Sequence, residues 1–85
     1  MSEQEACRLA VAAIVVEDPE SVRPLNEILH EYSGWIIGRM GIPYATKSVS
    51  LISVALDAPM DAISALTGKL GKLSGVSVKT AYSKV

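Results

Sequence analysis

Apolar and polar stretches divide the first half of the chain into a strand and a helix. The segment Cys7–Val16 is apolar apart from one arginine and ends in Val and Ile residues, which predicts a buried strand. Glu17–Ser21 then supplies the acidic side chains, proline and serine that are typical of a helix start. If Ser21 is the cap, Pro24 falls in the first turn, where no intrahelical donor is missing. Gly34 should end the helix as a left-handed terminator. The apolar stripe of this helix is Val22, Leu25, Leu29 and Tyr32.

The rest of the chain predicts a strand hairpin, a second helix and a last strand. Trp35–Tyr44 and Val49–Asp57 are apolar runs separated by a short polar link, so they should pair as an antiparallel hairpin. Asp57, Pro59 and Asp61 predict the start of a second helix. Gly75 should close this helix, and the alternation in Val76–Tyr82 predicts the last strand. The stripe of the second helix is Ile63, Leu66, Leu70 and Leu73.

Strand, helix and strand therefore occur twice, joined by a hairpin. This order predicts an α+β, ferredoxin-like βαββαβ fold: a four-stranded antiparallel sheet with two helices on one face and with the first and third strands at its centre. Both faces of these two strands are uncharged, unlike a sheet with one wet face. On the first strand the two sets are Leu9, Val11, Ala13 and Val15 against Ala10, Ala12, Ile14 and Val16; on the third they are Ile52, Val54 and Leu56 against Leu51, Ser53 and Ala55. The small residues of the second set on each strand suit packing against another subunit, which predicts self-association.

The run Gly38–Tyr44 is unusual for a strand because it holds two glycines, a proline and one arginine. A glycine inside a strand marks a bulge or a close approach by another backbone or a ligand. A proline cannot donate to the ladder, so it belongs on an edge strand or at a strand end. The run therefore fits a binding or assembly surface better than a catalytic centre.

Composition supports one small domain. We expect residues 1–6 to form a flexible N-terminus and residues 7–85 to form a single domain. Of the 85 residues 49% are hydrophobic, which is too many for a disordered segment and more than so small a domain can hide, so association is favoured. The net charge of −1 attracts neither nucleic acid nor an anionic membrane. One cysteine and the lack of a basic, then apolar leader fit a cytoplasmic protein without a membrane segment.

No set of residues in the sequence indicates catalysis. His30 is the only histidine, near a predicted helix end, and Cys7 is the only cysteine. Glu17 and Asp18 are explained as helix-capping residues. RNA binding on the sheet would need aromatic residues on the central strands, and these carry none. We therefore expect a protein that is not an enzyme and uses no cofactor. Arg39 is the best polar candidate: it could bind a carboxylate or phosphate, or pair with an acid across a subunit interface.

Three segments carry a family resemblance. Residues 65–79 resemble the second helix and last strand of ACT-type regulatory domains. Together with Ile28–Tyr32 and Ile37–Tyr44, they make the chain similar to the iron-only hydrogenase system regulators, which are short ACT-like proteins. The chain is also similar to the C-terminal domain of the nickel-responsive repressor. The resemblance implies a regulatory role in hydrogenase assembly or expression.

Two details of the resemblance argue against known ligands. His30 corresponds to the first histidine of the repressor's nickel site, but the two strand histidines fall on Gly41 and Pro43, so no metal site is expected and His30 alone remains as a candidate ligand. Amino-acid-binding ACT domains commonly have a glycine after the first strand, whereas Asp18–Ser21 stands here. The repressor's DNA-binding arm has no counterpart, so no direct nucleic-acid binding is expected.

These observations lead to one functional hypothesis and one alternative. We expect a regulatory domain that forms a dimer or tetramer with itself and binds a small effector or a protein partner at a subunit interface. The alternative is a purely structural or protein-interaction module without a small ligand. The candidate ligand or interface residues are Glu17, Asp18, Arg39, Met40, Gly41, Ile42, Pro43 and Tyr44.

Overall fold

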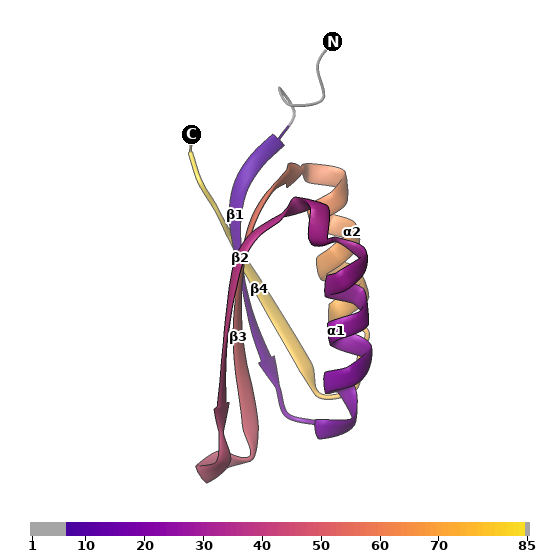
Figure 1. Cartoon of the computed structure of the whole chain (residues 1–85), viewed down its shortest axis with the longest axis vertical. Coiled ribbons are helices and arrows are strands. Elements are labelled where there is room, and N and C mark those ends of the chain that lie inside the picture. The colour runs from indigo at the N-terminus through magenta and orange to yellow at the C-terminus, as the bar shows by residue number, and fades with distance from the viewer. Residues whose placement is uncertain (1–6, 85) are drawn as a thin grey trace.

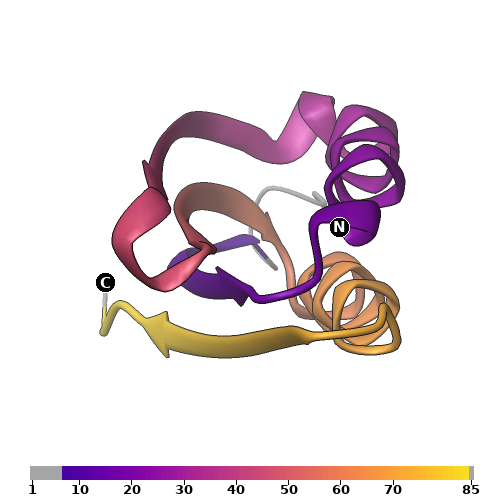
Figure 2. The same cartoon turned by 90° about the horizontal axis from the view of Figure 1, so that it is seen from below.

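The computed structural model describes residues 7–84, and the flexible N-terminus predicted for residues 1–6 lies outside this range. Two layers build the molecule: a sheet, and two helices that cover one face of it (Figures 1 and 2). The strands are β1 (Cys7–Val16), β2 (Ile36–Tyr44), β3 (Val49–Pro59) and β4 (Val76–Tyr82), and the helices are α1 (Val22–Glu31) and α2 (Met60–Gly71). Single 3-10 turns occupy Pro19–Ser21, Ser33–Trp35 and Ala45–Lys47.

The sheet has the order β2-β3-β1-β4 with every pair antiparallel. The predicted ferredoxin-like α+β fold is therefore confirmed, with β1 and β3 at the centre and β2 and β4 at the edges. Pro43 lies on an edge strand, where its missing N–H group is tolerated. The pairing of β2 with β3 shifts register between Ile36 and Gly38, so a bulge lies beside the first glycine of the Gly38–Tyr44 run.

The core lies between the sheet and the helices. Side chains at alternate positions of β1 and β3 meet the apolar stripes of both helices and are almost fully buried. These residues are Ala10, Ala12, Ile14, Val16, Ile52, Val54, Leu56 and Ala58 from the strands, and Leu25, Leu29, Ile63, Leu66 and Leu70 from the helices. On β1 the set that begins with Ala10 and Ala12 faces the helices, and the set that begins with Leu9 and Val11 is exposed. The expectation that the set with small residues would form the open side of the sheet was therefore wrong for β1, and it was right for β3. Alanines under a helix let it approach the sheet closely, which explains this choice.

The ends of the helices differ in part from the prediction. Gly75 was expected to close the second helix, but α2 ends at Gly71 with Lys72 as its C-cap. Gly75 lies in the turn before β4 and has φ of 68°, a left-handed conformation that glycine adopts readily. Gly34 does not have a positive φ; α1 ends at Glu31 and the chain continues into the 3-10 turn Ser33–Trp35. Pro24 lies in the first turn of α1, as expected. Neither helix within residues 7–84 is long and apolar enough to cross a membrane.

Candidate functional site

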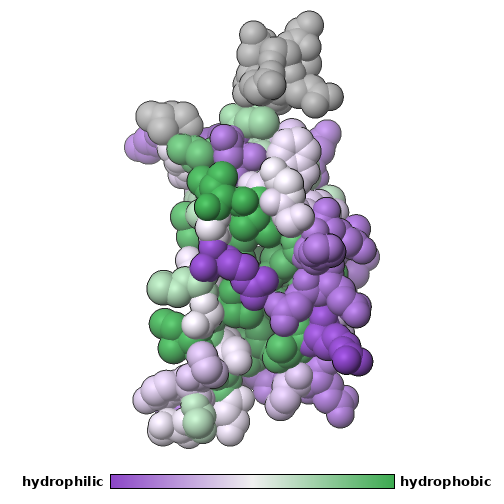
Figure 3. Space-filling view, viewed as in Figure 1, coloured by the Kyte–Doolittle hydropathy of each residue, from purple (hydrophilic) through white to green (hydrophobic). Residues whose placement is uncertain are grey.

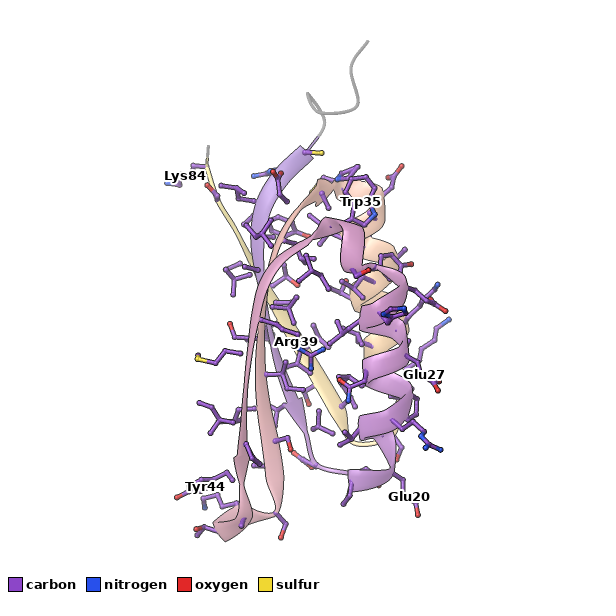
Figure 4. The ribbon with its side chains drawn as sticks, in the orientation of Figure 1. Glu20, Glu27, Trp35, Arg39, Tyr44 and Lys84 are labelled. Carbon is purple, nitrogen blue, oxygen red and sulfur yellow. The ribbon has the colours of Figure 1, made fainter. Side chains whose placement is uncertain are left out.

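The predicted site strand β2 presents two different surfaces. Because successive side chains on a strand point to opposite faces, Arg39, Gly41 and Pro43 lie on the helix side, opposite Val54, Ile52 and Ser50 of β3. Met40 and Ile42 lie on the other side, opposite Ser53 and Leu51. Figure 4 shows the Arg39 side chain directed toward α1 and the Tyr44 side chain directed away from the helices. The residues that the sequence grouped as one site therefore belong to two surfaces.

The first surface is the sheet face that no helix covers, which we call the open face. Its exposed apolar side chains include Val11 (45% exposed), Met40 (61%) and Leu51 (42%). By the strand register the open face consists of Leu9, Val11, Ala13, Val15, Gly38, Met40, Ile42, Leu51, Ser53, Ala55, Ser77 and Ala81, bordered by Asp57 and Lys79. The centre of the open face thus carries no charge. An exposed apolar area of this kind is a candidate interaction surface.

The open face is hollowed where its small residues lie. Ala13 and Ser53 form the floor of a hollow of about 260 Å³ whose rim includes Val15, Met40 and Leu51. A second hollow of about 350 Å³ lies further along β1, between Leu9, Ile37 and Tyr82 among others. Large side chains beside small ones give the face both projections and depressions.

The second surface is a groove between α1 and β2, which we call the α1–β2 groove. Its lower part, of about 390 Å³, is lined by Val16, Pro19, Val22, Pro43, Tyr44, Ala45, Ser48, Val49 and Ser50. Its upper part is wider and shallower, of about 660 Å³, and is lined by α1 and the preceding turn without a residue of β2: besides Pro19 and Val22 these are Arg23, Asn26, Glu27 and His30. The two parts meet at Pro19 and Val22, which line both. Figure 3 shows hydrophobic atoms gathered between the strand and the helix on this side of the molecule.

Of the predicted site residues, Pro43 and Tyr44 line this groove, and Arg39 lies beside it with a bond from β2 to α1. Its guanidinium Nη2 donates a hydrogen bond of 2.9 Å to Asn26 Oδ1 on α1. Within residues 7–84 the only ion pair joins Lys69 and Glu31, at 3.4 Å, so Arg39 has a neutral amide as its partner and no carboxylate within 4 Å. Asn26 was missed by the sequence reasoning, because a polar residue on the exposed side of a helix gives no distinguishing signal.

Glu17 and Asp18 have structural roles in the loop after β1. The Glu17 N–H donates to the Gly75 carbonyl at 2.7 Å, and Asp18 Oδ1 accepts from the Glu20 N–H at 3.0 Å. The buried Ser21 hydroxyl donates to the Ser74 carbonyl instead of capping α1. This loop is therefore tied to the turn between α2 and β4. Its 3-10 turn also supplies Pro19 to the α1–β2 groove, which Pro43 and Tyr44 of β2 line as well.

The remaining candidate ligands lie apart. His30 is exposed in the upper part of the groove, and Cys7 is partly buried at the start of β1. Across residues 7–84, no three His, Cys, Asp or Glu side chains gather closely enough to hold a metal ion.

Comparison with known proteins places the chain in a family. Its fold matches the solved structure of the uncharacterized protein TM1266 from Thermotoga maritima, with a TM-score of 0.88, 39% sequence identity, and coverage of 92% of this chain and 99% of that one. A comparison with curated proteins found no match.

Two more distant structures share the fold alone. A formyltetrahydrofolate deformylase from Pseudomonas putida KT2440 matches with a TM-score of 0.64 at 10% identity, over 86% of this chain and 28% of that one. CPII from Thiomonas intermedia K12, a nitrogen regulatory PII-like protein in its apo form, matches with a TM-score of 0.53 at 13% identity, over 89% and 91%. The model of the TM1266-like family, described as "Iron-only hydrogenase system regulator, putative", matches residues 8–80. The chain belongs to the TM1266-like family of iron-only hydrogenase system regulators.

Proposed function

We propose that the protein is a non-enzymatic regulator that self-associates through the open face of its sheet and responds to an effector bound near β2. The observation that carries this proposal is the uncharged centre of the open face, with Val11, Met40 and Leu51 each exposing more than two fifths of their surface. Burying such side chains stabilises association by about 1.5–3 kcal/mol for each fully buried one. The family to which the chain belongs is described as a regulator, which agrees with the proposal.

The shape of the open face supports pairing with a second copy. In a two-fold dimer the same patch meets itself, so each projection needs a depression in the same patch. Met40 projects beside the hollow over Ala13 and Ser53, and both features belong to one chain. A Met40 side chain can adapt its shape to such a hollow because it is unbranched and has three rotatable bonds.

An effector would act by favouring one assembly or conformation over another. This requires that it binds the two states with different affinity. Since β2 contributes Met40 and Ile42 to the open face and Pro43 to the lining of the α1–β2 groove, a shift of this edge strand on binding would be felt on both surfaces.

Self-association is tested by placing a charge at the centre of the open face. Val11→Glu should convert the assembly to a monomer of 9.0 kDa in sedimentation velocity, because a buried, unpaired carboxylate costs several kcal/mol. Met60→Glu is the matched control: Met60 is an exposed apolar residue at the start of α2, away from the open face, and its replacement should leave the mass unchanged. A wild-type mass of 9.0 kDa at all concentrations, or equal effects of the two substitutions, would contradict the proposal.

A further inference from the structure

We propose that the α1–β2 groove binds a small amphipathic monocarboxylate, with its carboxylate on Arg39 and its apolar chain between Val22 and Pro43. This inference names the effector class and rests on the proposed regulatory function for its biological meaning. It does not depend on self-association, because every residue of the groove belongs to one chain.

The groove exists because β2 places no large side chain against α1 at this level. Gly41 lies opposite Ile52, and a Cβ built on Gly41 would have its nearest neighbour, Ile52 Cγ1, at 4.0 Å. Pro43 is the next residue on the same side and lines the lower part of the groove. A side chain at position 41 would therefore meet only Ile52 within 4 Å, and it would stand on the helix side of β2 between Arg39 and Pro43. A volume of about 390 Å³ falls in the range of small-molecule sites, which is about 300–1,000 Å³.

The lining of the lower part fits an apolar chain. Val16, Val22 and Val49 supply hydrocarbon surface, and Pro19 and Pro43 supply rigid walls. The polar residues of the lining are Ser48, Ser50 and Tyr44, at the end of the β2–β3 hairpin, and the Tyr44 side chain is directed away from the helices (Figure 4). An apolar site with a few polar groups at its ends is typical of ligand pockets.

Arg39 supplies the charge that selects a carboxylate. Its partner Asn26 Oδ1 is neutral, at 2.9 Å, and a hydrogen bond to a charged acceptor is about twice as strong as one to a neutral acceptor. A guanidinium also offers parallel donors that match the two oxygens of one carboxylate. Asn26 holds Arg39 across the groove and keeps an N–H₂ group that can donate to the same ligand.

The charge balance favours a monoanion over a phosphate. The Arg39 guanidinium lies beside the groove on Asn26, which lines the upper part together with Arg23 and the acidic Glu27. A dianion would need more donors and would be repelled by Glu27. The four steps from Arg39 to Pro43 span about 13 Å at about 3.3 Å per residue, which accommodates a medium-chain carboxylate laid along β2.

The test is a titration of the full chain with sodium octanoate, followed by calorimetry and by amide NMR. Octanoate should shift the resonances of Gly41, Val22 and the Asn26 side-chain amide. Shortening the probe to hexanoate should weaken binding by about fourfold for each methylene removed. Arg39→Gln, which removes the charge at the surface of a folded domain, should weaken octanoate binding by about tenfold to a hundredfold.

Three further experiments test where octanoate binds and which ligand class the groove prefers. Lys72→Gln removes one positive charge at the end of α2 and should leave octanoate binding unchanged. Gly41→Val should fill the groove and abolish binding, with far-UV circular dichroism as a check of folding. Inorganic phosphate should not compete with octanoate.

The proposal is overturned if octanoate does not bind, if Arg39→Gln binds as the wild type does, or if phosphate displaces octanoate. Adsorption on the open face would be recognised by a loss of binding in Val11→Glu with binding retained in Arg39→Gln, which also overturns it. If the wild type does not bind octanoate and Gly41→Val lowers the mass of the assembly, the groove would instead be the binding site of a second copy of the chain. Self-association is read from the mass without octanoate, so failure of the groove proposal is distinguishable from failure of the assembly proposal.

Discussion

Replacing Gly75 by alanine should destabilise the domain more than any other change of one methyl group that we consider. Gly75 has φ of 68°, and the left-handed conformation costs an L-residue roughly 1–2 kcal/mol. The new Cβ would also lie 2.8 Å from both the backbone nitrogen and the Cβ of Asp18, and overpacking of this kind costs about 1–3 kcal/mol. Because the clash is with backbone, relief would disturb the bond from the Glu17 N–H to the Gly75 carbonyl. We expect a total loss of about 2–5 kcal/mol.

Urea denaturation followed by circular dichroism measures this loss as a lower midpoint at an unchanged slope. Gly68→Ala is the matched control, because Gly68 lies inside α2, is exposed, and a Cβ there would meet no atom within 4 Å. That substitution should stabilise the domain by about 0.5–1 kcal/mol. The same protein concentration is needed for all variants, since assembly adds to apparent stability. A Gly75→Ala variant within about 0.5 kcal/mol of the wild type, a typical surface effect, would refute the reasoning.

Two further predictions concern contacts of α1. Ser21→Ala should cost about 1–3 kcal/mol in the same urea assay, because Ser21 is buried and its hydroxyl satisfies the Ser74 carbonyl; a neutral result would contradict this role. The pKa of Lys69 is raised above its ordinary value of 10.5, chiefly by Tyr32 and then by Glu31. Since the charged form is favoured in the folded state, the stabilisation is present below pH 10.5 and is lost as pH rises through the folded pKa. Tyr32→Leu should lower the Lys69 pKa in a ¹³C NMR titration, and an unchanged titration would count against the contact.

The sequence sufficed for the fold because its local signals agree with one another. The stripe of each helix, the apolar runs of the strands and the turn residue Gly75 all predict the same arrangement, and that arrangement was confirmed. Gly34 was misjudged because a glycine after a helix can also continue into a 3-10 turn, which needs no positive φ. Such a choice depends on where the following strand must begin, and the local sequence does not contain that information.

The sequence located the candidate site on β2, but it did not show which of these residues face the helices and which face the open side of the sheet. Alternation predicts two faces for any strand, yet which residues face the helices depends on the register of β2 with β3, and the bulge between Ile36 and Gly38 resets that register. Asn26 and Pro19 come to the groove from other elements through tertiary packing. No spacing in the sequence indicates that these two residues lie beside β2. The uncharged open face was easier to predict, because both alternating sets of residues on the central strands are uncharged in the sequence.

The most direct test of the central claim is the solvent accessibility of methyl groups in the wild-type protein, measured by NMR with a soluble paramagnetic agent. The claim is that a second copy covers the open face. If it does, the methyl groups of Val11 and Leu51 should be protected as well as those of the buried Val54. Relaxation enhancement in proportion to their exposure in a single chain, 45% for Val11 and 42% for Leu51 against 0% for Val54, would contradict it.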